Sequence, residues 1–171
     1  MSMRIKLKNK GLTLIELVIV IGILGILAVA ALVALNPLAQ FQKADDVRRK
    51  SDLAQIQRAL ESFYQDYGSY PQNTSDYLIT YIDKTQNSPA SVTVQWGSSW
   101  QPYMNVFPKD PSSSNHYAYY SPDGQSYYLY AILDRVNTSD QCQAKSPVPC
   151  GDPICGTGGC NYGVSSPNVT P

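Results

Sequence analysis

The pattern of apolar and polar positions begins with a long apolar segment. Residues 12–35 are all apolar except Thr13 and Glu16. The hydrocarbon core of a bilayer takes about 20 consecutive apolar residues, so segment 12–37 predicts a helix that spans a membrane.

After this segment the apolar residues become periodic. Segment 38–68 repeats them at spacings of three and four, which predicts an amphipathic helix with one face in a hydrophobic core. Gly68 is a natural helix stop, and Pro71 prevents continuation. We therefore expect one helix over residues 12–67 with a bend near Pro37. Its core face comprises Leu53, Ile56, Leu60, Phe63 and Tyr67.

Three residues are candidates for bending this helix, namely Gly22, Gly25 and Pro37. Proline removes one helical hydrogen bond and favours a bend or a break. Glycine lowers the helix propensity of its position. A straight helix remains the alternative.

The segment after the helix, residues 69–136, predicts a small α+β head. Segment 76–84 has apolar residues at helical spacing and predicts a short second helix. Segment 92–96 reads as a strand. Segments 117–121 and 126–133 flank an Asp-Gly turn and predict a hairpin. The expected fold class is α+β, a long N-terminal helix packed on an antiparallel sheet of three or four strands.

The tail, residues 137–171, is rich in Pro, Gly and Ser and predicts a loop with little regular structure. Four cysteines in such a segment suggest two disulfides with three possible connectivities, which would staple the loop. A zinc site is the rival, but no Cys-x-x-Cys pair occurs and the one histidine, His116, is distant in sequence. The candidates are Cys142, Cys150, Cys155 and Cys160.

Charge is distributed unevenly although the formal net charge is zero. The first eleven residues hold four basic side chains and no acid, which leaves nine Lys and Arg against thirteen Asp and Glu in the rest. That remainder has no basic surplus for a phosphate backbone, so no specific nucleic acid is inferred as a partner. Basic residues directly before an apolar span place the N-terminus in the cytoplasm.

Glu16 discriminates between interpretations of the apolar segment. A secretory signal cut after Ala30, which would release a secreted binding protein or enzyme, fits the basic start and the small residues of 28–30. A plain signal anchor fits the length equally well. Neither has a use for a carboxylate in a hydrophobic run, which is costly in a bilayer unless it finds a partner.

The motif that gives Glu16 a use is Lys10-Gly11-Leu12-Thr13-Leu14-Ile15-Glu16-Leu17. It resembles the class III signal of type IV prepilins and type II secretion pseudopilins. The resemblance implies that residues 1–11 are a leader, that a prepilin peptidase cuts between Gly11 and Leu12, and that the new amino group of Leu12 is N-methylated. Glu16 would then pair with that amino group on a neighbouring subunit, since a matched pair of buried charges fixes register. Leu12 stands where Phe is commonest, so the extent of methylation stays open.

Two further motifs extend the resemblance over residues 1–135. The helix exit Tyr67-Gly68-Ser69-Tyr70-Pro71 is similar to the exit in pilins and major pseudopilins, and 107–111 resembles their Pro-Lys-Asp-Pro element. Some pseudopilins bind calcium in this region, where Asp110 and Asp123 offer oxygens, but no further ligands are recognisable and we assign no metal.

The resemblance implies a structural filament subunit of a type IV pilus, with the major pseudopilin of a type II secretion system as the alternative. The expected partners are other copies in a helical filament, the prepilin peptidase, a membrane assembly platform and a cytoplasmic assembly ATPase. The subunit would sit in the cytoplasmic membrane before it enters an extracellular or periplasmic filament. No phosphate loop, dinucleotide fingerprint or metalloprotease motif occurs, so we assign no catalytic residue and no cofactor. Motility, adhesion, DNA uptake and glycosylation stay open.

Overall fold

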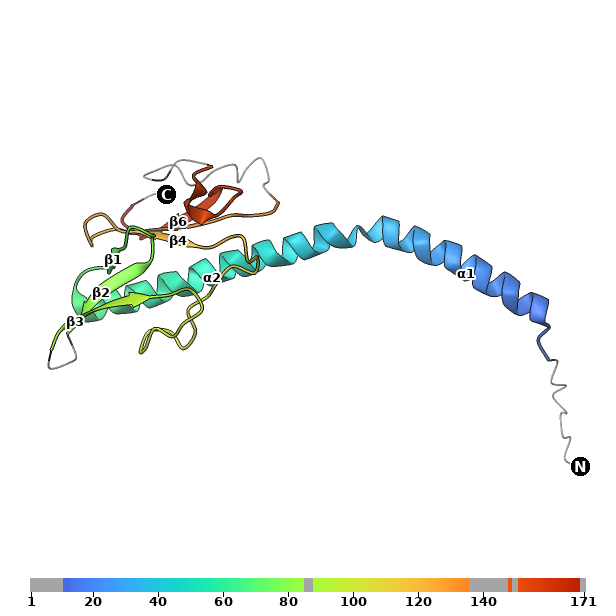
Figure 1. Cartoon of the computed structure of the whole chain (residues 1–171), viewed down its shortest axis with the longest axis horizontal. Coiled ribbons are helices and arrows are strands. Elements are labelled where there is room, and N and C mark those ends of the chain that lie inside the picture. The colour runs from blue at the N-terminus through green and yellow to red at the C-terminus, as the bar shows by residue number, and fades with distance from the viewer. Residues whose placement is uncertain (1–10, 85–87, 136–147, 149–150, 170–171) are drawn as a thin grey trace, which may run out of the picture. The chain divides into compact units, whose positions relative to one another are not determined.

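The computed structural model describes residues 11–84, 88–135, 148 and 151–169. The chain divides into two compact units, Met1–Gln40 and Phe41–Pro171. The first contains helix α1 and the start of helix α2. The second contains the rest of α2 and a head of short strands (Figure 1).

The apolar and amphipathic segments form two consecutive helices, α1 (Leu14–Leu35) and α2 (Pro37–Tyr67). The interruption lies at Asn36, which has φ 41° and ψ 68°. Asparagine adopts this left-handed region more readily than most residues, and proline is favoured in the first turn of the helix that follows. Gly22 and Gly25 lie inside α1, which continues through both.

The amphipathic prediction for α2 is confirmed, because four of the five residues of the predicted core face are buried and the fifth, Tyr67, is partly buried. The last helical turn is closed by Gly68, whose N–H donates to the carbonyl of Tyr64 at 2.8 Å and whose φ is +72°. Glycine commonly ends helices in this conformation. The buried apolar residues of α2 are Leu53, Ile56, Ala59, Leu60 and Phe63.

In the part of the chain that the structure describes, the head has two antiparallel three-stranded sheets, which lie along the C-terminal half of α2 (Figure 1). The α+β fold class is therefore confirmed, with two small sheets in place of the expected single one. The first sheet has the order β1-β2-β3, formed by Gln72–Asn73, Ile79–Asp83 and Ala90–Val94. The second has the order β4-β5-β6, formed by Ala118–Tyr120, Tyr128–Ala131 and Tyr162–Ser165.

The predicted hairpin is confirmed as β4 and β5, which pair with Tyr119 opposite Leu129. Its turn uses Gly124 at φ +69°. The carboxylate of Asp123 accepts hydrogen bonds from the N–H groups of Gln125 and Ser126 at 2.9 and 3.1 Å. These bonds close the turn and also lower the pKa of Asp123.

The helix predicted for 76–84 is wrong, because strand β2 occupies most of this segment. Short apolar runs fit helical and strand periods about equally well. Two features favour the strand. The Thr74 side chain accepts from the N–H of Asp76 and of Leu78, which forms a turn at the strand's start. Ile79 is fully buried whereas Ile82 is half exposed, and pairing with β3 satisfies the backbone of β2.

The tail also contains more regular structure than its composition predicts. A short 3-10 helix, η1 (Pro153–Cys155), precedes β6, which pairs with β5 along its whole length. At Gly163 an added Cβ would lie 3.1 Å from the ring of Tyr130, so glycine lets the two strands pack closely here. Composition indicates turns but carries no information on a strand that a distant partner stabilises.

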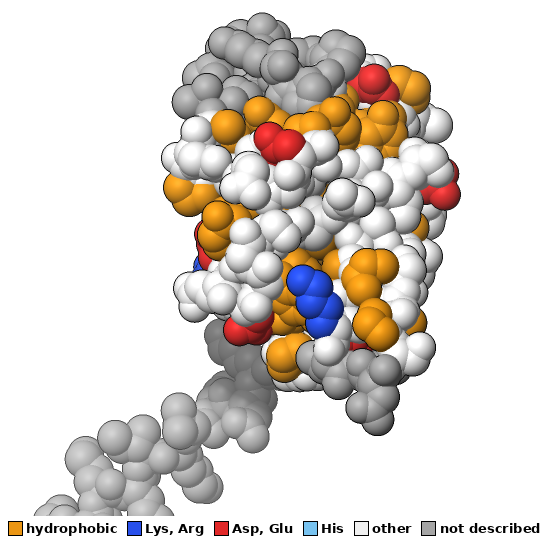
Figure 2. Space-filling model, turned by 90° about the vertical axis from the view of Figure 1, so that its left-hand side faces the viewer, with side chains coloured by type: hydrophobic (Ala, Val, Ile, Leu, Met, Phe, Trp, Pro, Cys, Tyr) orange, Lys and Arg blue, Asp and Glu red, His pale blue; other side chains and the backbone are white. Residues whose placement is uncertain are grey.

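The hydrophobic core of the head is largely aromatic. Phe63 of α2 stacks on Tyr67 at 4.2 Å between ring centroids, and Trp96 stacks on Phe107 at 4.6 Å. Trp100, Phe107, Tyr119 and Tyr130 are almost fully buried. At the end of the head seen in Figure 2, hydrophobic side chains also reach the surface.

Candidate functional site

The α1 helix leaves all of its apolar surface uncovered within the chain. None of its residues is buried, and its Leu, Ile and Val side chains are 47% to 80% exposed. Its composition and length make it a candidate membrane span. Because burial of apolar surface is the main favourable term in folding and association, this helix presents a surface suited to burial against lipid or another apolar surface.

The N-terminus of α1 is closed by a capping box between Thr13 and Glu16. The Glu16 carboxylate accepts from the Thr13 N–H and the Thr13 hydroxyl, both at 2.8 Å. The Thr13 oxygen in turn accepts from the Glu16 N–H at 3.3 Å. Residues 11–13 are outside the helix and exposed. The only polar pair of the apolar segment thus lies beside the predicted cleavage site, with Gly11 and Leu12 in non-helical backbone.

A buried arginine in the middle of α2 ties this helix to the loops of the head. The Arg49 side chain is 1% exposed. Its guanidinium donates in a bidentate way to Asp110, from Nε at 2.9 Å and from Nη2 at 3.1 Å. Nη1 donates to Asp46 at 3.0 Å and to Asp134 at 2.8 Å. We name these four residues the Arg49 cluster.

Two acidic residues of the cluster, Asp46 and Asp110, also accept hydrogen bonds from backbone N–H groups. The Asp46 carboxylate accepts from the N–H of Asp134 at 2.7 Å and from that of Arg135 at 2.9 Å. Asp110 accepts from the N–H of Ser112 at 2.8 Å. The cluster therefore joins α2, the loop after residue 107 and the segment after β5 through charge-assisted bonds, which are stronger than neutral ones.

Electrostatics of the cluster favour the charged arginine. Burial alone would lower the pKa of Arg49, but the hydrogen bonds and charges of Asp110 and Asp134 raise it above its ordinary value. One turn further along α2, burial raises the pKa of Asp52, and its bond from the Tyr117 hydroxyl at 2.9 Å only partly offsets this. Burial and the same bond raise the pKa of Tyr117.

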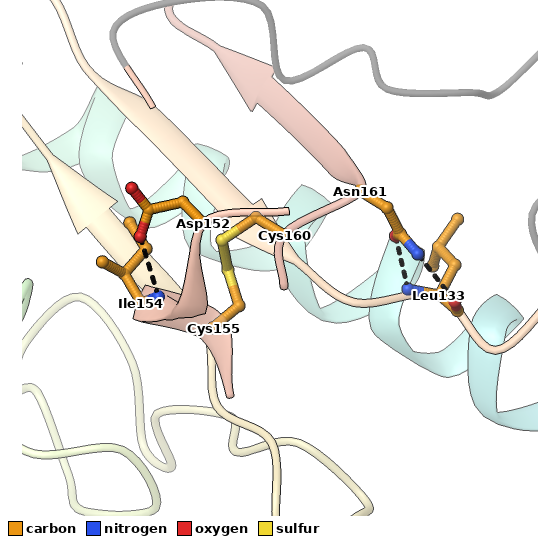
Figure 3. Close-up of a disulfide and its surroundings, with 6 residues drawn as sticks. All are labelled: Leu133, Asp152, Ile154, Cys155, Cys160 and Asn161. Atoms are coloured by element: carbon orange, nitrogen blue, oxygen red, sulfur yellow. Dashed lines mark hydrogen bonds between the residues drawn. A yellow bond between two sulfur atoms is a disulfide. The ribbon is translucent and has the colours of Figure 1, made fainter. Parts of the chain in front are cut away.

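One disulfide joins Cys155 and Cys160, both fully buried (Figure 3). The loop that it closes is anchored at both ends. The Asp152 carboxylate accepts from the N–H of Ile154 at 3.0 Å. Asn161 bonds both the N–H and the carbonyl of Leu133, at 2.7 and 2.9 Å. The expected stapling of the tail is thus present at this pair, and Cys142 and Cys150 lie outside the described residues.

The aspartates considered as metal ligands are engaged in other interactions. Asp110 forms an ion pair with Arg49, and Asp123 accepts hydrogen bonds that close the β4–β5 turn. His116 is exposed. Within the residues that the structure describes, no group of three or more His, Cys, Asp or Glu side chains is placed to hold a metal ion.

Sequence reasoning missed the capping box and the Arg49 cluster. The first has a recognisable signal, since Thr followed three residues later by Glu before an apolar run is a capping-box pattern. For the second, Asp46 and Arg49 are spaced as a helical i,i+3 pair. The partners Asp110 and Asp134 lie 61 and 85 residues from Arg49, which no local pattern reveals.

An exposed apolar helix that continues into an amphipathic helix carrying a small antiparallel head defines a pilin-like subunit. The model of the prokaryotic N-terminal methylation motif matches residues 6–32, and that of type II secretion system (T2SS), protein G matches residues 36–135. The second match covers more than half of the chain, which therefore belongs to the protein G family among the type IV pilins and pseudopilins. These families are structural and not enzymatic, and their N-terminal motif fits membrane anchoring. No curated protein and no solved structure was found to match the chain.

Proposed function

We propose that this chain is the structural subunit of a type IV pilus-like filament and polymerises through α1. The observation that carries the proposal is the exposure of every apolar side chain of α1, which one copy cannot bury alone. Before assembly lipid covers this surface, and afterwards the α1 helices of neighbouring copies do.

The proposed processing takes place at the non-helical residues before α1. A prepilin peptidase cuts between Gly11 and Leu12, and the new amino group of Leu12 is methylated. The Glu16 carboxylate, held beside this site by Thr13, then pairs with the amino group of a neighbouring subunit. Mass spectrometry of the mature protein should give a chain that begins at Leu12. A chain that begins at Ala31 would instead support a secreted protein.

The charge of Glu16 can be separated from its capping role. Glutamine also serves at this position of a capping box, so Glu16→Gln keeps the cap and removes the charge. We expect Glu16→Gln and Glu16→Ala to be exported and cleaved but to form few filaments. The control is Thr13→Ser, which keeps both the cap and the charge. Normal filaments from Glu16→Gln would exclude the proposed charge pair.

A second candidate is the major pseudopilin of a type II secretion system, which the protein G match over residues 36–135 favours. Both functions share the same assembly chemistry, and the machinery outside the chain separates them. In a deletion strain complemented with the chain, subunits sheared from intact cells identify a pilus. Loss of exoprotein secretion in the deletion strain, with complemented subunits retained in the envelope, identifies a pseudopilus.

A further inference from the structure

A small hollow lies on the head where α2 ends. It has a volume of about 300 Å³, at the lower end of the range for small-molecule sites. Figure 2 shows this end of the head, where a basic side chain lies among hydrophobic ones. The lining residues that matter here are Asp66, Tyr67, Tyr81, Asp83, Lys84 and Tyr103.

The aromatic walls of the hollow are fixed by packing. One face of the Tyr67 ring stacks on Phe63 at 4.2 Å, which leaves the opposite face for another partner. The Tyr81 ring stands nearly perpendicular to Tyr67, at 81° and 5.9 Å between centroids. Tyr103 packs against Phe63 at 5.3 Å, and its hydroxyl donates to the carboxylate of Asp66 at 2.9 Å. Rigid rings at right angles beside a held carboxylate form a preorganised corner.

The hollow already accommodates a cation from the chain itself. The ammonium of Lys84 lies over the Tyr67 ring, 5.7 Å from its centroid. A second hollow of about 290 Å³ shares Tyr67, Tyr81 and Lys84 with the first, so the lysine side chain lies where the two meet. Aromatic faces attract cations through the ring quadrupole, and cages of such rings bind quaternary ammonium groups.

The charges of the lining favour a further cation. Asp66 and Asp83 contribute two carboxylates against the single ammonium of Lys84, so the formal charge of the lining is negative. Lys84 and Asp66 are exposed, which allows the lysine to move aside without disturbing the core.

We propose that this hollow is a binding site for a small organic ammonium ion, with the trimethylammonium group as its best ligand. The rings of Tyr67, Tyr81 and Tyr103 line the space for the methyl groups, and the carboxylates of Asp66 and Asp83 balance the charge. Lys84 occupies the site in the free protein and competes with the ligand.

The test uses the full-length chain in a maltoside detergent, with ¹³C-labelled tyrosine rings observed by NMR during titration with choline. We expect saturable shifts of Tyr67, Tyr81 and Tyr103. The neutral isostere 3,3-dimethylbutan-1-ol has the same shape without the charge and should bind much more weakly. Equal binding of the isostere, or no saturable shift with choline, overturns the proposal.

Substitutions at two exposed residues test the roles of Lys84 and Asp66 in choline binding. Lys84→Gln removes the competitor and should tighten choline binding about threefold, whereas Asp66→Asn should weaken it about threefold. Lys109→Gln is the matched control, because it removes an exposed head lysine outside the hollow. Tighter binding in both lysine variants would indicate a general charge effect and contradict the site.

A comparison of choline with glycerophosphocholine assigns the source of the ligand. Equal binding indicates that a lipid headgroup is accepted, and weaker binding indicates a free small cation. Either result supports the site, provided that the Lys84→Gln effect is present.

Discussion

Replacing Arg49 by methionine removes the one cation from the Arg49 cluster while keeping a side chain of similar length. Asp110 then stays buried, with no exposed side-chain surface, and loses both bonds from the guanidinium. Asp46 and Asp134 lose one bond each. Removing one partner of a buried ion pair costs about 3 to 5 kcal/mol, because the remaining charge is uncompensated.

Fluorescence reports this change on the head alone, because both tryptophans, Trp96 and Trp100, belong to its core. Urea unfolding of the full-length protein in detergent should therefore show a free energy of unfolding about 3 to 5 kcal/mol lower for Arg49→Met. Small domains are stable by about 5 to 15 kcal/mol, so the variant head is marginal.

The neighbouring residue provides a matched control. Arg48 is 62% exposed and lies 4.0 Å from Asp52 across one helical turn. Arg48→Met makes the same chemical change on the surface and should cost at most about 1 kcal/mol. Adding Asp110→Asn to Arg49→Met removes the orphaned charge and should restore part of the loss, by about 1 kcal/mol or more. Equal costs for the two arginine variants, or no recovery in the double variant, would refute the reasoning.

The remaining predictions concern the core and the disulfide. Tyr117→Phe deletes a buried bond to the Asp52 carboxylate and should cost about 1.5 to 3 kcal/mol by urea unfolding, whereas Tyr103→Phe, whose partner Asp66 is exposed, should cost far less. Burial raises the pKa of Asp52 above 3.8, so its folded form binds the proton more tightly and stability falls as pH rises through that pKa. Asp52→Asn should remove this fall in a series of urea midpoints from acid to neutral pH, and identical slopes for both proteins would contradict it. Cys155→Ser opens a loop of sequence separation 5 and should cost about 2 kcal/mol by urea unfolding under oxidising conditions, and an unchanged midpoint would contradict this.

The pattern of apolar residues correctly predicted the elements whose buried face is set within a single helix or strand. The apolar run, the buried stripe of α2 and the strands around the Asp-Gly turn each carry their signal within one continuous segment of the chain. The segment 76–84 was misassigned because Tyr77, Leu78, Tyr81 and Ile82 suit a helix by spacing. In the structure, this segment is a strand because β2 pairs with β3 and the Thr74 side chain forms a turn at its start.

The functional-site residues also differ in how far the sequence alone predicts them. Glu16 was recognisable because a carboxylate in an apolar run has few physical explanations. Arg49 was not, because on a helix an arginine beside an aspartate looks like an ordinary surface pair. Its burial depends on Asp110 and Asp134, which the fold brings to it from far along the chain.

The sequence distance between Arg49 and its partners has a consequence for the order of events during export. On the proposed route the chain leaves the membrane from its anchored end onward, so Arg49 emerges 85 residues ahead of Asp134. Until Asp134 has crossed, the guanidinium lacks one of its acceptors, and burying it would cost more free energy than leaving it hydrated. On this route the Arg49 cluster, and with it the fold of the head, is completed only after residue 134 has crossed, so a filament of the proposed kind would take up only fully translocated subunits.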